Sequence, residues 1–153
     1  MRNKLGKSMM VITIIIIPLL FSCASTQRKQ SESKGADFYN KRGIEFGMKG
    51  QYDQAILDFK KALNINPRYA EAYNNRGIAY GQKGRYDQAI LDFNKALEIN
   101  PGYADAYYNR GIVYYSKKEY AKSWDDIKKA QGLGGQVPPE FLEDLRKALG
   151  RQN

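Results

Sequence analysis

Histidine is absent from the 153 residues, and cysteine and tryptophan occur once each. Without histidine the chain lacks the commonest general base and the commonest metal ligand of proteins. A single cysteine can form no internal disulfide and has no second thiolate with which to hold a metal. No phosphate-binding glycine loop is evident either, because the recurring glycines Gly43, Gly77 and Gly111 fall inside predicted helices. We therefore expect a protein that is not an enzyme and that uses no cofactor or metal.

Long apolar runs are also missing. The longest, from Met9 to Phe21, has about 13 residues, whereas a transmembrane helix needs roughly 20. Basic residues precede this run and small or neutral residues follow it, which is the layout of an export signal. The sequence predicts that residues 1–22 form such a signal. Residues 24–35 contain no large apolar side chain, so they predict a flexible tether.

The end of this signal, Leu20-Phe21-Ser22-Cys23, resembles the bacterial lipoprotein signal, in which a cysteine follows an aliphatic residue at −3 and a small one at −1. The resemblance implies cleavage before Cys23 and acyl chains on that residue, so the lipidated cysteine and the flexible tether together span residues 23–35. It also implies an exported protein anchored to the cell membrane by lipid, in the outer membrane if the source is Gram-negative. The alternative is an uncleaved short anchor with an incidental cysteine.

What the sequence does contain is a period of 34 residues. Residues 36–69 and 70–103 are identical at 24 of 34 positions, and residues 104–137 keep the same landmarks. In each copy, small and aromatic residues recur at spacings of three and four in two runs, which predicts two helices. Gly84 lies between the runs, where a left-handed helix end is needed, and Pro101 stops the second helix. Three such hairpins must stack to bury their apolar faces.

These landmarks resemble the tetratricopeptide repeat, which has an aromatic at position 4, Gly at 8, Tyr at 11, Ala at 20, an aromatic at 24, Ala at 27 and Pro at 32. In the second copy they are Tyr73, Gly77, Tyr80, Ala89, Phe93, Ala96 and Pro101. The third copy departs from the pattern at Lys118, in place of the turn glycine, and at Gly135, in place of the proline. The resemblance implies an all-α solenoid of three repeats over 36–137, with tyrosines at positions 4, 11 and 17 in the core.

Residues 138–150 follow the repeats and carry the start and stop signals of one more helix. Two prolines begin the segment, acids occupy its first turns, basic residues its last turn, and Gly150 follows. Phe141, Leu145 and Ala148 share one face. We expect a capping helix that covers the apolar edge of the last repeat.

Arg42, Arg76 and Arg110 all occupy position 7 of the repeats, in step with acids at position 23, which are Asp58, Asp92 and Asp126. A permanently charged guanidinium at a half-buried position needs such a partner. We expect each arginine to pair with a carboxylate within its own or an adjacent repeat. The alternative is a ladder of cations that binds an acidic peptide.

The first helices of such repeats line the concave face of the solenoid in the family that this chain resembles. Asn75 and Asn109 lie in register there and resemble the asparagine ladders by which some members grip a peptide backbone. Tyr108 and Tyr115 stand where the pattern demands no aromatic. The clamp for a C-terminal carboxylate is not expected, because the third repeat has Asp105 and Asn109 where that clamp needs Lys and Arg. The candidate groove residues are Asn40, Lys41, Asn74, Asn75, Ile78, Tyr108, Asn109, Ile112 and Tyr115; alternatively, the asparagines merely hydrate a solvated face.

Three hypotheses of function follow. The first is a membrane-tethered adaptor that binds a protein or peptide in the cell envelope, in an assembly, secretion, pilus or cell-wall complex. The second is a self-associating structural unit. The third is binding to an anionic polymer or lipid surface, suggested by the net charge of +9. An export signal argues against nucleic acid as the partner, and the cations are spread over all the repeats.

Overall fold

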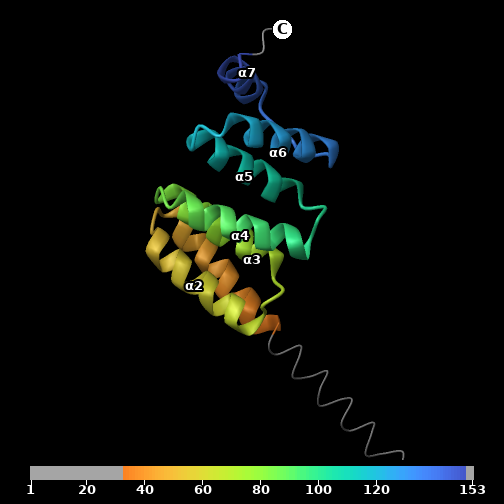
Figure 1. Ribbon diagram of the computed structural model, residues 1–153. Coiled ribbons are helices and arrows are strands. Elements are labelled where there is room, and N and C mark those ends of the chain that lie inside the picture. The colour runs from red at the N-terminus through yellow and green to blue at the C-terminus, as the bar shows by residue number, and fades with distance from the viewer. Residues whose placement is uncertain (1–32, 151–153) are drawn as a thin grey trace, which may run out of the picture.

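The computed structural model describes residues 33–150, and every regular element in that range is a helix. The first helix covers 33–48. Six more follow: α2 (Tyr52–Ile65), α3 (Ala70–Gln82), α4 (Tyr86–Ile99), α5 (Ala104–Ser116), α6 (Tyr120–Gly132) and α7 (Pro139–Ala148). They stack in chain order, as Figure 1 shows from the orange first helix to the blue α7. The all-α solenoid of helix-turn-helix repeats is confirmed.

Each repeat is a hairpin that also packs on its neighbour. α3 lies against α4 in the second repeat and α5 against α6 in the third, while α2 packs on α3 and α4 on α5 across the repeat boundaries. Consecutive first helices touch as well, since α3 contacts α5. Each hairpin therefore buries apolar side chains against the next element along the stack, as a solenoid requires.

The turn inside each hairpin uses a left-handed residue. Gly50 and Gly84 have φ angles of 72° and 70°, and Lys118 at the same position of the third repeat has φ 62°. Glycine adopts this conformation without steric cost, whereas a residue with a Cβ does not. The third hairpin thus keeps the geometry of the other two despite its substitution.

The second helix of the third repeat ends differently. In the first two repeats it ends at Ile65 and Ile99, ahead of Pro67 and Pro101. α6 ends at Gly132 instead, and Gly134 follows with φ 82°. Gly134 therefore ends this helix in place of a proline, which explains how the third repeat tolerates Gly135 at position 32, where the other two have Pro67 and Pro101.

The boundary predicted for the tether is wrong by three residues. Residues 33–35 were predicted to be flexible, but they are already helical and belong to the first helix. A Cβ on Gly35 would lie 3.5 Å from the Ile65 side chain, so this extra turn packs against the end of α2. Tertiary contact supplies the order that the polar composition does not.

The same core contacts recur in each of the three repeats. A Cβ on Gly43, Gly77 or Gly111 would come within 2.7–2.9 Å of Phe59, Phe93 or Ile127, so position 8 has room only for hydrogen. The buried alanines of the second helices share the core with those phenylalanines. Tyr80 is buried, and Tyr73 and Tyr86 pack half-buried against the apolar clusters, which confirms their core role.

The last helix, α7, caps the stack on α6. Pro138 lies 34 residues after Ala104, so α7 occupies the sequence register of the first helix of a fourth repeat. Leu145 is fully buried, while Phe141 and Ala148 are half-buried. The predicted capping helix is confirmed. Of the helices within residues 33–150, none has the length and apolar character needed to cross a membrane.

Candidate peptide-binding groove

The first helices of the repeats turn one stripe of side chains toward a shared groove. The stripe comprises positions 2, 6, 9 and 13, which recur on one helix face because the helix has 3.6 residues per turn. We call this surface the groove face. It consists of Asp37, Lys41, Ile44 and Met48, then Glu71, Asn75, Ile78 and Gln82, then Asp105, Asn109, Ile112 and Ser116.

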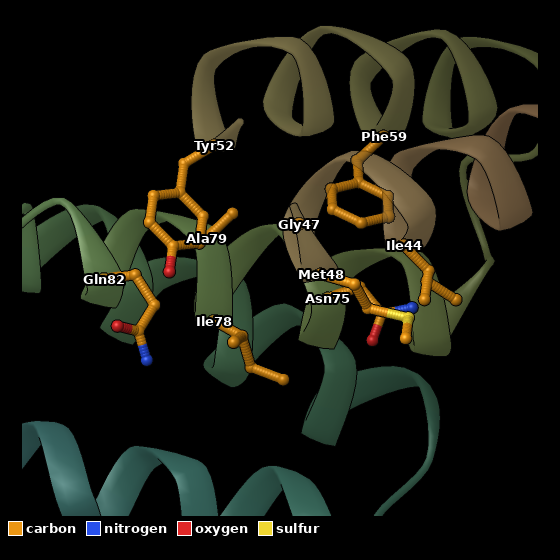
Figure 2. Close-up of a pocket in the computed structure, with 9 residues that line it drawn as sticks. All are labelled: Ile44, Gly47, Met48, Tyr52, Phe59, Asn75, Ile78, Ala79 and Gln82. Carbon is orange, nitrogen blue, oxygen red and sulfur yellow. The ribbon is translucent and has the colours of Figure 1, made fainter. Parts of the chain in front are cut away.

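A first pocket of about 280 Å³ opens between the first helix, α2 and α3. Tyr52 and Phe59 reach it from α2, Ile44 and Met48 come from the first helix, and α3 adds three groove-face residues with Ala79 (Figure 2). Gly47 also lines it, and a Cβ there would meet nothing within 4 Å. The absence of a side chain at Gly47 helps to keep this mostly apolar pocket open.

A second pocket of about 540 Å³ lies one repeat further on. Every residue that lines the first pocket has its counterpart 34 positions later in the second, which also includes Gly84. The counterparts are Ile78, Gly81, Gln82, Tyr86, Phe93, Asn109, Ile112, Val113 and Ser116. Gln82 replaces Met48 and Ser116 replaces Gln82, so the second pocket is more polar than the first.

The third position of this series is filled by Tyr115. This residue stands where Gly47 and Gly81 leave the other two pockets open. Its ring centroid lies 5.4 Å from that of Tyr120 and 5.3 Å from that of Phe141 in α7. Tyr108 also faces Phe141, with centroids 6.2 Å apart. The two tyrosines predicted as groove candidates therefore pack on the capping helix.

The predicted asparagines form pairs across repeat boundaries. Asn75 Nδ2 donates to Asn40 Oδ1 at 3.1 Å, and Asn109 Nδ2 donates to Asn74 Oδ1 at the same distance. Asn40 and Asn74 are only 1% and 4% exposed. Treating these two as groove residues was wrong, because position 5 faces the next repeat and is covered by it. Asn75 and Asn109 stay half-exposed and line the two pockets.

The other groove candidates keep their places. Ile78 lines both pockets, and Ile112 lines the second. Lys41 is exposed on the groove face of the first helix. Sequence reasoning missed Tyr52, Phe59 and their counterparts Tyr86 and Phe93, which reach the pockets from the second helices. The available signal was that tyrosine at position 17 and phenylalanine at position 24 recur in the two repeats that have glycine at position 12.

The arginines at position 7 are all paired. Arg76 donates from Nε and Nη2 to both oxygens of Asp92 at 2.7 Å, and Arg42 and Arg110 bond Asp58 and Asp126 in the same way. The hydrogen bond from Arg42 lowers the pKa of Asp58 despite its burial. The predicted pairing within each repeat is confirmed.

Within residues 33–150, no three histidine, cysteine or acidic side chains gather as a metal site would require. The buried polar side-chain atoms of this range all have hydrogen-bond partners. The groove is thus a surface of pockets, amides and apolar rings, and its chemistry is suited to binding.

Comparison with known families agrees with this geometry. The tetratricopeptide repeat (TPR) profile matches residues 70–103, and related TPR profiles match 48–84 and 93–125. Together they cover more than half of the chain. The chain belongs to the tetratricopeptide-repeat family.

Several solved TPR structures share this fold. The first TPR of Spaghetti (RPAP3), bound to the HSP90 peptide SRMEEVD, has a TM-score of 0.71 and 25% identity over 77% of this chain and 93% of its own. The Arabidopsis OM64 TPR domain gives 0.72 and 24% over 76% and 98%. The crystal structure of MamA gives 0.63 and 29%, over 67% and 60%.

Among curated proteins, an uncharacterized protein of Methanocaldococcus jannaschii is 42% identical over 38 residues, which are 25% of this chain. The match covers 44% of that relative's length. This likeness is confined to about one repeat.

Proposed function

We propose that this TPR protein is a non-catalytic adaptor, tethered to a membrane of the cell envelope, whose groove binds a protein or peptide partner. The observation that carries the proposal is the pair of equivalent pockets on the groove face. The likeness to the first TPR of Spaghetti, solved with an HSP90 peptide bound, supports peptide binding by this fold. Assembly, secretion, pilus or cell-wall complexes are the settings we propose.

The half-exposed amides favour an extended peptide as the ligand. Within the described residues, Asn75 and Asn109 each use one amide hydrogen for the bond to the preceding repeat. A side-chain amide has a second donor and a carbonyl acceptor, and these match the groups of any peptide bond. Apolar side chains of the ligand would enter the pockets beside them.

The test of this function fills both pockets with tyrosine, the residue that the third repeat has at the same position. Gly47→Tyr with Gly81→Tyr copies the third repeat, where position 12 is Tyr115. A Cβ at Gly47 meets nothing within 4 Å, and at Gly81 it would lie 3.5 Å from a Val113 methyl, which is ordinary contact. We expect the folded double variant to lose the partners that the full chain captures by cross-linking in solubilised envelope.

The control is a double substitution on the second helices, away from the two pockets. Leu57 and Leu91 are exposed on the second helices, so Leu57→Gln with Leu91→Gln should leave capture unchanged. Equal melting temperatures for wild type and variants would show that the fold is intact. Unchanged capture by the glycine variant would move the binding site away from the groove.

The membrane tether rests on Cys23, which lies outside the described residues. Cys23→Ser removes the thiol that would carry an acyl chain, so the precursor should stay unprocessed or the product unlipidated. Detergent partitioning and the mobility of the processed form measure this. A mutant that is cut at the same place and stays in the membrane would contradict the lipoprotein assignment.

A second candidate function is self-association, and exposed side chains on the first helix favour it. Phe38 is 55% exposed on the first helix. The Arg42 side chain is 38% exposed, compared with 17% and 18% for Arg76 and Arg110, which have a preceding repeat beside them. Light scattering that shows a concentration-dependent dimer, abolished by Phe38→Ser, would support this function. A monomer at all concentrations would contradict it.

A further inference from the structure

Both pockets offer the ligand apolar walls one repeat apart, from Ile44, Ile78 and Phe59 in the first and from Ile78, Ile112 and Phe93 in the second, although polar side chains also line the second. The first pocket is the more apolar, since Met48 occupies the place that Gln82 takes in the second. Tyr115, packed on Phe141, fills the place of a third. A ligand segment therefore has two apolar anchors, and its charge is decided by what surrounds them.

Beside the pockets runs a row of three acids, one in each repeat. Asp37, Glu71 and Asp105 all occupy position 2. No lysine or arginine within residues 33–150 forms a salt bridge with any of them. The other acids that recur at repeat spacing are paired, with Asp58, Asp92 and Asp126 bound to arginines and Asp53 and Asp87 bound to Lys83 and Lys117.

This row borders the groove. Positions 2 and 9 lie seven residues apart, which is nearly two helical turns, so Glu71 and Ile78 share a face about 10 Å apart. Glu71 Oε1 accepts a hydrogen bond from Asn40 Nδ2 at 3.1 Å, and Asn40 in turn accepts from Asn75 at the first pocket. The acid and the pocket are joined by one buried amide.

The pKa values of two tyrosines near the acids are raised, in part by the negative charge of these carboxylates. Burial raises the pKa of Tyr69 to about 12, with further contributions from its hydrogen bond with Asp37 and the charge of Glu71. The pKa of Tyr103 is also raised, first by burial and then by the charges of Glu71 and Asp105. The three carboxylates, which form no salt bridge within residues 33–150, place negative charge along this edge of the groove, although the chain carries a net charge of +9.

We propose that the groove ligand is a cationic peptide segment with two apolar anchors. The anchors enter the first and second pockets, and lysine or arginine side chains of the ligand pair with Glu71, Asp105 and Asp37. Lys41 stands next to Asp37 on the groove face, so the preference for cations is strongest at the second and third repeats. The inference rests on the proposed function of the groove and adds the chemistry of its ligand.

The first experiment selects ligands without assuming a sequence. A phage-displayed library of random 12-residue peptides is panned on the full chain in phosphatidylcholine nanodiscs, with empty nanodiscs as the blank. The variant with tyrosine at positions 47 and 81 identifies which peptides need the pockets. We expect pocket-dependent peptides to carry two apolar residues and a clear excess of lysine and arginine over the unselected library.

The selected peptides distinguish a wrong ligand charge from a wrong binding site. Pocket-dependent peptides that are neutral or acidic overturn the cationic ligand and leave the groove in place. Peptides that bind the wild type and the pocket variant equally overturn both the ligand and the proposed groove.

The second experiment measures the charge pairing. Glu71→Gln with Asp105→Asn removes two charges but keeps the oxygen that Asn40 bonds. We expect selected peptides to bind about 3–10-fold more weakly at low salt, as expected for two exposed ion pairs. The difference should shrink at about 0.5 M salt because of screening.

The control makes the same change of net charge away from the groove. Asp125 and Glu143 are exposed on α6 and α7, so Asp125→Asn with Glu143→Gln tests long-range attraction alone. Weaker binding only in the groove variant supports pairing at the row. An equal loss in both double variants, or no loss in either, overturns it.

Discussion

Replacing Lys118 by glycine should stabilise the third repeat. Lys118 has φ 62°, while the residues at the same position of the other hairpins are Gly50 and Gly84, with φ 72° and 70°. Its side chain is exposed and makes no salt bridge within residues 33–150. The change therefore acts on the backbone and removes no contact that holds the fold together.

The magnitude follows from two opposing free energies. A residue with a Cβ pays about 1–2 kcal/mol in the left-handed region relative to glycine. Glycine loses more conformational freedom on folding, which costs roughly 0.5–1 kcal/mol. The net gain in the free energy of unfolding is about 0.5–1 kcal/mol, which corresponds to a rise in Tm of about 2–5 °C for a structured body of this size.

Thermal unfolding of three variants followed by circular dichroism separates the causes. Lys118→Gly should melt higher, and Lys118→Ala should melt close to the wild type because it keeps a Cβ in the same conformation. Gly84→Ala should melt lower by a similar amount, since a Cβ there meets nothing within 4 Å and the cost is conformational only. If Lys118→Gly melts no higher than Lys118→Ala, the backbone argument is refuted.

Three further variants test packing, charge and the cap. Gly77→Ala would bring a Cβ within 2.7 Å of Phe93, so it should lower stability by about 1–3 kcal/mol in denaturant melts; an unchanged midpoint would contradict the tight crossing. The pKa of Asp58 is lowered by Arg42, so its contribution to stability is present above the unfolded pKa of about 3.9 and disappears as pH falls toward the folded pKa. Asp58→Asn should therefore destabilise the protein at neutral pH and lose that difference below about pH 4, whereas a constant difference would contradict the pairing. Deleting residues 138–150 removes two buried or half-buried apolar side chains worth roughly 1.5–3 kcal/mol each, so the melting temperature should fall clearly, and an unchanged melt would mean that α7 is not docked.

The sequence alone determined the features that depend on spacing within one hairpin. Two helices per copy follow from the recurrence of small and aromatic residues, and the pairing of Arg76 with Asp92 follows from their constant separation of 16 residues. The glycine at position 8 also belongs to this group, because the side chain that it admits comes from the same repeat. Helical periodicity fixes these relations whatever the neighbouring repeats contain.

Only the tertiary structure decided the features that depend on the neighbouring repeat. Asn40 and Asn75 are both asparagines on first helices, but position 5 is covered by the next repeat and position 6 faces the pocket. Tyr115 lies where glycine would open a third pocket, and it fills that place because Phe141 of the cap stands against it. A periodic sequence gives equivalent positions the same local structure, whereas burial is set by which element stacks beside each one, and that differs at the two ends of the array.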